Sequence, residues 1–268
     1  MRLLLIPLLL LATALPAAAA GDFPYDLESG QEAAIIGTTA GLFGVGWLVD
    51  RGYEPLTPEE IAAMDPSSLP AIDRAATRRW SPKADHASDI MVYTLMAAPL
   101  TLALTDQGSR EPGTLGLIYL ETMLLESGTV YLLKNVFERS RPFVYNDDPD
   151  IPLDLKMSRT ARRSFPSGHA ANAFASMVFT ANVYGKLYPD SDARGWVWGG
   201  CMAAATTTAY LRYAAGRHFV TDLLAGAVIG GLAGWLVPQW HEVDAVDELR
   251  DPSAKSDPGM TLSLRFGF

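Results

Sequence analysis

The sequence is poor in cysteine and has fewer basic than acidic residues. Cys201 is the only cysteine in 268 residues, which excludes a disulfide framework; it lies in an apolar run, as a packed residue would. Lys and Arg number 21 against 30 Asp and Glu, and the formal net charge of −9 argues against nucleic acid as a partner. An alternating strand pattern is absent until the last residues, and there is no internal repeat. These absences predict a single all-α domain.

Apolar residues recur at helical spacing in six segments. The segments are 33–49, 87–105, 113–138, 168–187, 195–213 and 218–237, and connections rich in Pro, Gly and charge separate them. The pattern predicts a helical bundle of about six main helices, with short helices in the connection 51–82. Gly226, Gly230 and Gly234 recur every four residues in the last segment, which favours close approach of a neighbouring helix.

The two ends of the chain differ from this body. Residues 1–20 carry Arg2, an apolar run and small residues before Gly21, which predicts a signal peptide and export to the periplasm. Residues 260–268 alternate like a strand, and we interpret them as a short strand-like tail. The expected organisation is a signal peptide at 1–20 and an N-terminal helical part of the same domain at 21–112. A core that carries the motifs follows at 113–240, and a tail at 241–268.

Three short motifs carry the candidate chemistry, and the first is basic. Lys134 and Arg141 are seven residues apart, so on one helix they would project from nearly the same side. The helix is expected to end near Pro142, which places Arg141 where its guanidinium can bind two phosphate oxygens. Alone, this pair is more typical of a solvated basic turn after an amphipathic helix than of a phosphate site.

The second motif is Pro166-Ser167-Gly168-His169, which opens the fourth apolar segment. Ser167 is a predicted helix N-cap, and Gly168 allows the backbone to approach a ligand. Free N–H groups and the positive end of the helix dipole would then face an anion, with His169 beside it.

The third motif places Arg212 at the end of one predicted helix, with His218 and Asp222 at the start of the next. The spacing of four residues on a helix predicts that the Asp222 carboxylate orients the His218 imidazole. His86 and Asp89 have a similar spacing but no phosphate-binding residues nearby in the sequence, and we interpret them as an ordinary helix surface.

Together the motifs resemble the signature of the type 2 phosphatidic acid phosphatase family, which is related to bacterial class A acid phosphatases and vanadium haloperoxidases. The signature reads K-x6-R-P, P-S-G-H and S-R-x5-H-x3-D, and the chain departs from it at Leu211, where the family has Ser. The resemblance covers residues 113 to 235 and implies the family's all-α fold and a phosphatase activity on phosphate monoesters or pyrophosphates.

The resemblance also implies roles for these residues. His218 would be the nucleophile that forms a phosphohistidine, Asp222 would orient it, and His169 would be the general acid. The phosphate oxygens would be bound by five residues: Lys134, Arg141, Ser167, Gly168 and Arg212. No metal and no cofactor is implied, and the partner is a phosphorylated small molecule or a lipid phosphate.

A basic run precedes the second motif. Arg159, Arg162 and Arg163 stand out against the acidic background, and Arg162 and Arg163 are candidate substrate contacts. A solvated basic loop explains the same run equally well. The connection 139–165 is expected to form part of the wall of the site.

Features of the sequence argue both for and against helices that span a membrane. Six apolar segments match the membrane-embedded branch of the family, and 195–213 has the length to cross a bilayer. Against spanning, the mean hydropathy without the leader is about zero, and Glu121 and Glu126 would be unfavourable in lipid. A cleaved leader with six spans would also place the site on the cytoplasmic side. The sequence therefore favours a soluble or peripheral periplasmic protein over an integral membrane protein with a periplasmic site.

Two other functions fit the motifs less well. A vanadate-dependent haloperoxidase would use the same site, although the chain lacks the extra length expected of one. A non-catalytic phosphate- or lipid-binding protein would have no need of His218 and Asp222, and both are present.

Overall fold

The computed structural model describes residues 23–51 and 54–243, so the predicted signal peptide and the strand-like tail lie outside the described residues. The helices are α2 (Ser29–Asp50), α3 (Pro58–Ala62), α4 (Ala71–Arg74), α5 (Pro82–Ala97), α6 (Pro112–Val136), α7 (Leu153–Lys156), α8 (Gly168–Leu187), α9 (Arg194–Ala214) and α10 (Val220–Trp240). A 3₁₀ stretch, Ala98–Leu104, continues α5. Within the described ranges the only strand-like pairing is an isolated bridge between Tyr25 and Glu242. The predicted all-α fold is confirmed.

Each of the six predicted apolar segments corresponds to a long helix. These helices start where the sequence provides suitable first residues: Pro82 and Pro112 occupy the first turns of α5 and α6, where proline has no hydrogen bond to lose. The Ser81 side chain caps α5 by accepting from the Ala84 N–H at 3.2 Å. The connection 51–82 contains the short helices α3 and α4, as expected.

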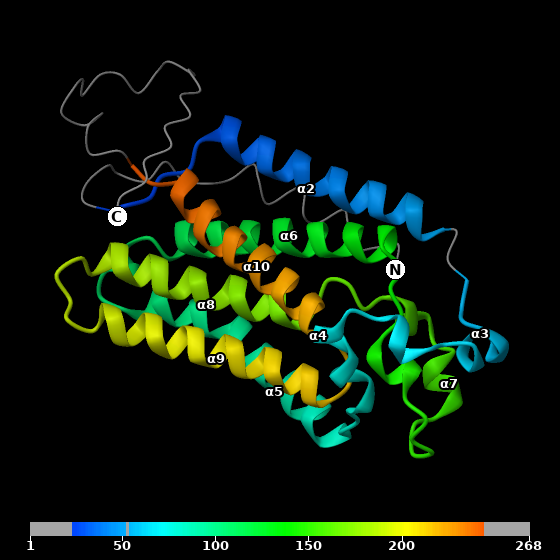
Figure 1. Ribbon diagram of the computed structural model, residues 1–268. Helices are drawn as coiled ribbons and strands as arrows, with labels where there is room; N and C mark the ends of the chain where they lie inside the picture. Colours follow the sequence, from blue (N-terminus) through cyan, green and yellow to red (C-terminus); the bar gives the residue numbers. More distant parts are fainter. Residues whose placement is uncertain (1–22, 52–53, 244–268) are drawn as a thin grey trace.

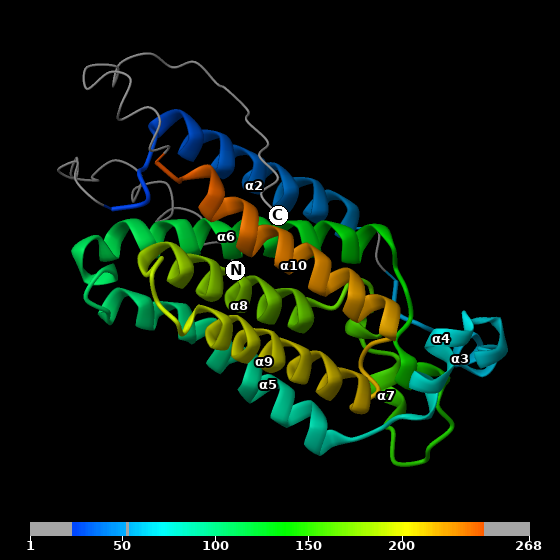
Figure 2. The same cartoon turned by 60° about the vertical axis from the view of Figure 1, so that its left-hand side comes forward.

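The long helices form a bundle (Figures 1 and 2). Helix α10 packs along α8 and also against α6, and α2 lies along α6. Helix α9 packs against α8 and α5, which also contact each other. A central cluster of buried side chains, including Ile118, Phe179 and Val237, joins α6, α8 and α10. The short helices α3, α4 and α7 lie together at one end of the bundle.

Three glycines of α10 account for its close contact with α8. A Cβ atom at Gly230 would lie 2.0 Å from the Ala171 carbonyl oxygen. Those at Gly226 and Gly234 would each lie 2.4 Å from a carbonyl oxygen, that of Ser167 at the N-cap of α8 and that of Ala175 within the helix. Only glycine is therefore compatible with this separation of the two backbones. The predicted close helix approach at these residues is confirmed.

Three helices are long and apolar enough to cross a membrane by length and composition: Ser29–Asp50, Pro82–Leu104 and Val220–Trp240. Only 17%, 28% and 39% of their most apolar windows are buried within the protein. Large apolar side chains such as Trp47 on α2, Tyr93 on α5 and Val228 on α10 are exposed instead. Surfaces of this kind fit contact with lipid.

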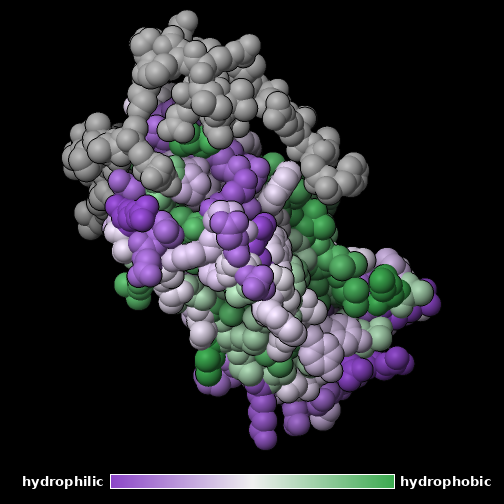
Figure 3. Space-filling view, turned by 90° about the vertical axis from the view of Figure 1, so that its left-hand side faces the viewer, coloured by the Kyte–Doolittle hydropathy of each residue, from purple (hydrophilic) through white to green (hydrophobic). Residues whose placement is uncertain are grey.

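These findings change two of the sequence-based arguments about the membrane. The segment 195–213, now α9, is not among the three candidate spans. Glu121 and Glu126 are only 3% and 1% exposed, so the protein interior surrounds them and they would not meet lipid. Figure 3 looks onto the end of the bundle where α2 begins and α10 ends, and hydrophilic residues gather there between hydrophobic patches on the flanks. The structure thus favours the integral-membrane alternative.

Candidate functional site

The three sequence motifs come together at one end of the bundle, on the side of the short helices (Figure 1). Lys134 lies in the last turn of α6, His169 in the first turn of α8 and Arg212 in the last turn of α9. His218 and Asp222 lie at the start of α10, just before and just inside the helix. Alternating helix directions therefore bring residues more than eighty positions apart to one place. We call Lys134, Arg141 and Arg212, grouped around His218, the cationic cluster.

Lys134 and Arg141 do not share a helix, contrary to expectation. Helix α6 ends at Val136, and Glu138 has a φ of 26°, which turns the chain out of the helix. Arg141 has extended backbone angles and caps the 3₁₀ turn that follows it. Proximity comes instead from the 139–165 connection, which folds back over the site.

That connection forms part of the wall, as predicted. The Lys134 ammonium donates to the Arg163 carbonyl oxygen at 3.1 Å, and the Arg141 Nε donates to the Thr160 carbonyl oxygen at 2.9 Å. Within the described part of the chain, neither cation has a carboxylate within ion-pair distance. Backbone carbonyls hold both side chains in place and bring no opposite charge, so both side chains remain available to bind an anion.

Ser167 and Gly168 begin α8 as predicted. The Ser167 side chain is fully buried and accepts from the Ala170 N–H at 3.4 Å, which makes it the N-cap. Its own N–H donates to the Asp222 carbonyl oxygen at 3.0 Å, linking the starts of α8 and α10. A Cβ at Gly168 would make only ordinary contacts at 3.7 Å, one of them with Lys134.

His218 precedes α10 rather than opening it. The helix begins at Val220, so Asp222 occupies its first turn and accepts from the Phe219 N–H at 2.9 Å. The closest approach of the His218 Nδ1 to the Asp222 carboxylate is 3.7 Å, longer than a hydrogen bond. Nδ1 is buried without a hydrogen-bond partner among the described residues. Asp222 thus faces the ring, and Nε2 lies on the opposite side of it.

Two residues that the motif analysis did not identify hold Asp222 in position. Arg139 donates to the Asp222 carboxylate at 2.6 Å and to Asp73 at 2.8 Å, and its guanidinium lies over the Phe219 ring. Ser164 donates to the other Asp222 oxygen at 2.5 Å. Asp73 also accepts from the Thr221 N–H at 3.1 Å, so α4 caps α10. In the sequence, Arg139 and Ser164 were marked only by lying close to the motifs. No feature of the sequence pointed to Asp73.

Acidic residues of α5 contact the remaining motif residues. Arg212 donates to Asp85 at 2.6 Å, to Ser88 at 3.0 Å and to Asp89 at 3.3 Å. The His169 Nε2 lies 2.7 Å from the Asp89 carboxylate. The interpretation of Asp89 as an ordinary helix surface was therefore wrong, because tertiary packing of α5 against α8 and α9 brings it to the site.

Arg162 and Arg163, the candidate substrate contacts, both form ion pairs. Arg162 donates to Glu60 at 2.6 Å, and Arg163 is paired with Asp50. Asp50 also accepts from Arg159 at 2.6 Å. These pairs attach the basic run to the end of α2 and to α3, whereas the Arg163 carbonyl oxygen reaches the cationic cluster.

The electrostatic environment favours a neutral imidazole at His218. The side chain is 1% exposed, and burial together with the nearby Arg141, Lys134 and Arg212 cations lowers its pKa well below the ordinary value. Burial and the Arg141 guanidinium also lower the pKa of Lys134 to about 7. Burial and Arg212 lower the pKa of His169 to about 4, while Asp89 opposes that shift. Burial is the largest cause of each shift, and a bound anion would offset the part that the neighbouring cations contribute.

A cavity of about 210 Å³ lies elsewhere, between α6 and α10. It is lined by apolar residues and by Glu126 and Thr129, and no member of the cationic cluster borders it. Its apolar lining does not suit a phosphate group. The candidate functional site is therefore the cationic cluster and not this cavity.

Residues 115–244 match the model of the PAP2 superfamily. The segment contains the cationic cluster, His169, His218 and Asp222. The match begins three residues into α6 and ends just beyond α10.

Two relatives that are named as phosphatases match parts of the chain. The lipid A 4'-phosphatase of Bacteroides thetaiotaomicron is 35% identical over 109 residues, which cover 39% of this chain and 43% of that protein. A probable lipid phosphate phosphatase beta of Arabidopsis thaliana is 32% identical over 130 residues, covering 42% of this chain and 59% of that protein. The chain thus spans less than two thirds of the length of either relative.

One solved structure is also similar. The transmembrane PAP2 type phosphatidylglycerolphosphate phosphatase of Bacillus subtilis superposes with a TM-score of 0.42 at 23% sequence identity, covering 81% of this chain and 98% of that one.

Proposed function

The chain belongs to the PAP2 superfamily, and from that membership and the cationic cluster we propose that it is a phosphatase acting on lipid phosphates. The observation that carries the proposal is the pair Lys134 and Arg141. Neither has an ion-pair partner among the described residues, and burial together with these two basic groups lowers the pKa of His218. Two uncompensated charges beside a neutral imidazole suit an anionic group that this imidazole attacks.

In the proposed reaction, His218 Nε2 attacks the phosphorus atom. The bond from phosphorus to the leaving oxygen breaks, and His169 gives its proton to that oxygen. His169, now without that proton, takes a proton from a water molecule that attacks the phosphorus. The bond from phosphorus to Nε2 breaks, inorganic phosphate leaves, and both imidazoles return to their starting forms. Lys134, Arg141 and Arg212 would stabilise the three oxygens of the transferring group.

His169 must carry a proton to act as the acid, although its pKa in the free protein is low. A phosphate dianion would offset the repulsion from the Arg212 and Arg141 cations and raise that pKa. Asp89, 2.7 Å from the His169 Nε2, would hold the protonated ring in place. Substrate binding would thus prepare the acid for its step.

Lipid phosphates are proposed as substrates for two reasons. The relatives that match include a lipid A 4'-phosphatase and a probable lipid phosphate phosphatase. In addition, the three apolar helices α2, α5 with its 3₁₀ extension, and α10 expose side chains that fit lipid. We further propose that residues 113–240 form the catalytic core, with the site at the periplasmic face of the membrane. Because α2 runs toward the site, this orientation places the start of α2 on the cytoplasmic side and is incompatible with a cleaved leader at residues 1–20.

The activity is tested by phosphate release from a lipid phosphate in detergent micelles, in buffer containing a chelator. Wild-type protein is expected to turn over, and His218→Ala is expected to lose turnover entirely. His86→Ala is the matched control, because His86 is an exposed histidine of α5 outside the cluster. Labelled substrate should give an acid-labile, alkali-stable protein phosphate in wild type. Turnover that survives in His218→Ala would refute the mechanism.

A soluble aryl phosphate, assayed in parallel, separates the substrate classes. Activity on that compound alone would replace the lipid substrate by a small phosphoester. Absence of both activities, with tight vanadate binding, would support a haloperoxidase instead.

The orientation is tested by labelling a cysteine introduced at Asp148, in the 139–165 connection, with Cys201→Ser as the background. A periplasmic site predicts that a membrane-impermeant reagent labels this cysteine in intact cells. Labelling only after lysis would place the site on the cytoplasmic side.

A further inference from the structure

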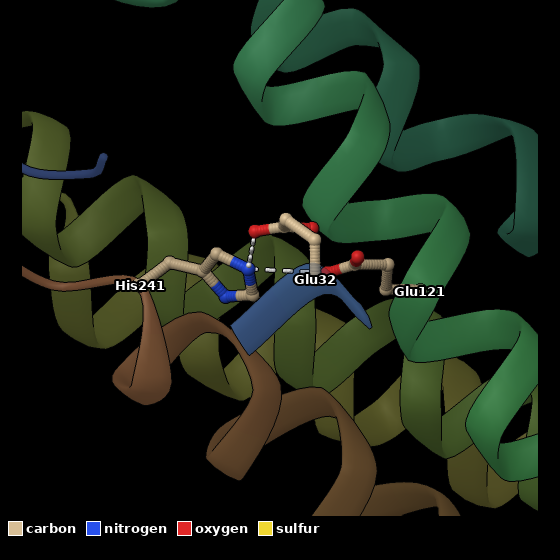
Figure 4. A group of neighbouring side chains, drawn as sticks. All are labelled: Glu32, Glu121 and His241. Carbon is tan, nitrogen blue, oxygen red and sulfur yellow. Dashed lines mark hydrogen bonds and ion pairs between the residues drawn. The ribbon is translucent and has the colours of Figure 1, made fainter. Parts of the chain in front are cut away.

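A second group of polar side chains lies at the opposite end of the bundle from the cationic cluster. Glu32 of α2, Glu121 of α6 and His241, directly after α10, each offer a ligand atom, and these atoms lie within 4.8 Å of one another. Figure 4 shows the two carboxylates converging on one nitrogen of the imidazole. The Nε2 atom is 3.1 Å from an oxygen of Glu32 and 3.1 Å from an oxygen of Glu121.

The orientation of the ring is fixed from its other side. The His241 Nδ1 lies 2.8 Å from the Val237 carbonyl oxygen. A carbonyl oxygen can only accept, so Nδ1 carries a proton and donates it. In the neutral ring the lone pair of Nε2 then points at two carboxylates. Histidines that bind metal ions commonly have this arrangement, with one nitrogen on the ion and the other donating to a backbone carbonyl.

The carboxylate oxygens lack the partners that buried charges need. Glu121 is 3% exposed, and neither of its oxygens has a hydrogen bond within the described part of the chain. The second oxygen of Glu32 is also buried without one. A single N–H of His241 could satisfy at most part of this set. A buried Glu121 carboxylate beside the partly buried Glu32 carboxylate is unfavourable without a compensating charge.

The spacing suits a metal ion. Adjacent ligand atoms of an octahedral ion with bonds of ~2.1 Å are about 3.0 Å apart, close to the two 3.1 Å separations observed. One imidazole and two carboxylates form a ligand set of the kind that binds divalent transition metals. We propose that Glu32, Glu121 and His241 bind a divalent transition-metal cation that fastens α2 to α6 and to the end of α10.

The surrounding backbone supports this fastening role. The Asp26 N–H donates to the His241 carbonyl oxygen at 2.9 Å, and the Gln31 side chain donates to the Trp240 carbonyl oxygen at 2.7 Å. The start of α2 is thereby held against the end of α10 around the proposed ion. Helix α10 separates this site from Asp222 by 19 residues, about 28 Å of helix, so the ion takes no part in the proposed hydrolysis.

The test uses full-length protein in detergent, freed of metal with a chelator and of any affinity tag. Zn²⁺ or Co²⁺ is then added, and bound metal is quantified after equilibrium dialysis. We expect one ion per chain, a higher melting temperature with either ion, and visible absorption bands from bound Co²⁺. The rise in melting temperature is measured on the wild-type protein, so this part of the test remains valid even if a substitution prevents folding.

Two variants and two controls locate the ion. Glu121→Gln and His241→Gln should lose the bound equivalent and the thermal shift. Glu126→Gln, another buried glutamate of α6, and His86→Gln should retain both. If wild type takes up no stoichiometric cation, or if Glu121→Gln and His241→Gln bind as much as wild type, the proposal is wrong. His241 would then be a protonated ring shared between two carboxylates.

Discussion

Arg139→Ala should destabilise the protein strongly, although Arg139 belongs to none of the sequence motifs. Within the described residues, the Arg139 guanidinium is the only cation paired with Asp73. It is also the only one paired with Asp222, apart from His218, whose Nδ1 lies 3.7 Å from that carboxylate. Both carboxylates are fully buried. Removing one partner of a buried ion pair typically costs about 3–5 kcal/mol, because the remaining charge is left in the interior.

The structure places the expected value at the lower end of that range. The Arg139 side chain is 22% exposed, so part of its charge is already solvated. Asp73 keeps its hydrogen bonds from Thr221, and Asp222 keeps those from Ser164 and the Phe219 N–H. We therefore expect a loss of about 3 kcal/mol in the free energy of unfolding, which corresponds to a fall in melting temperature of about 6–12 °C.

The assay is thermal unfolding in one detergent, with Lys186→Ala as control. Lys186 pairs with Glu242 at 2.7 Å, but its side chain is 43% exposed, so its loss should cost less than about 1 kcal/mol. Arg139→Lys, which restores one charge, should recover part of the difference. A melting temperature for Arg139→Ala equal to that of Lys186→Ala would refute the reasoning that this arginine neutralises two buried carboxylates.

Two further predictions concern the site and the bundle. Lys134→Gln should lower kcat/KM about 10–100-fold, because a charged contact worth about 1.5–3 kcal/mol is lost. It should also move the acidic limb of the pH–rate profile upward, since removing a nearby cation raises the pKa of His218; an unmoved limb would contradict the electrostatic argument. Gly230→Ala should lower the melting temperature, because its Cβ would lie 2.0 Å from the Ala171 carbonyl oxygen, whereas Gly231→Ala meets nothing nearer than 4.0 Å. Gly231→Ala should be neutral or stabilising, and equal effects of the two would show that α10 is free to shift.

The sequence by itself determined the helices and the inventory of the candidate site. Apolar spacing depends on neighbours along the chain, so it predicted the six long helices, and Ser167 was recognisable as a cap from local preferences alone. The motifs selected Lys134, Arg212 and His218, which the fold brings together. Their individual roles in catalysis remain predictions.

Local arguments were wrong at the ends of helices, both where α6 stops and where α10 starts. Lys134 and Arg141 were expected on one helix, but the turn at Glu138 ends α6 first. His218 was expected inside α10, but it precedes the helix, so its distance to Asp222 is 3.7 Å rather than that of a hydrogen bond. Helix ends depend on capping partners, and here one partner, Asp73, comes from α4.

Only the tertiary structure decided which side chains meet across the bundle. Asp89 reaches His169 across 80 positions, and Glu32 reaches His241 across 209. No spacing rule relates such residues, because their distance depends on how whole helices pack. The same packing showed that Glu121 and Glu126 are buried in protein, while apolar faces of α2, α5 and α10 are left uncovered. Composition is a property of the chain, whereas exposure is a property of the fold.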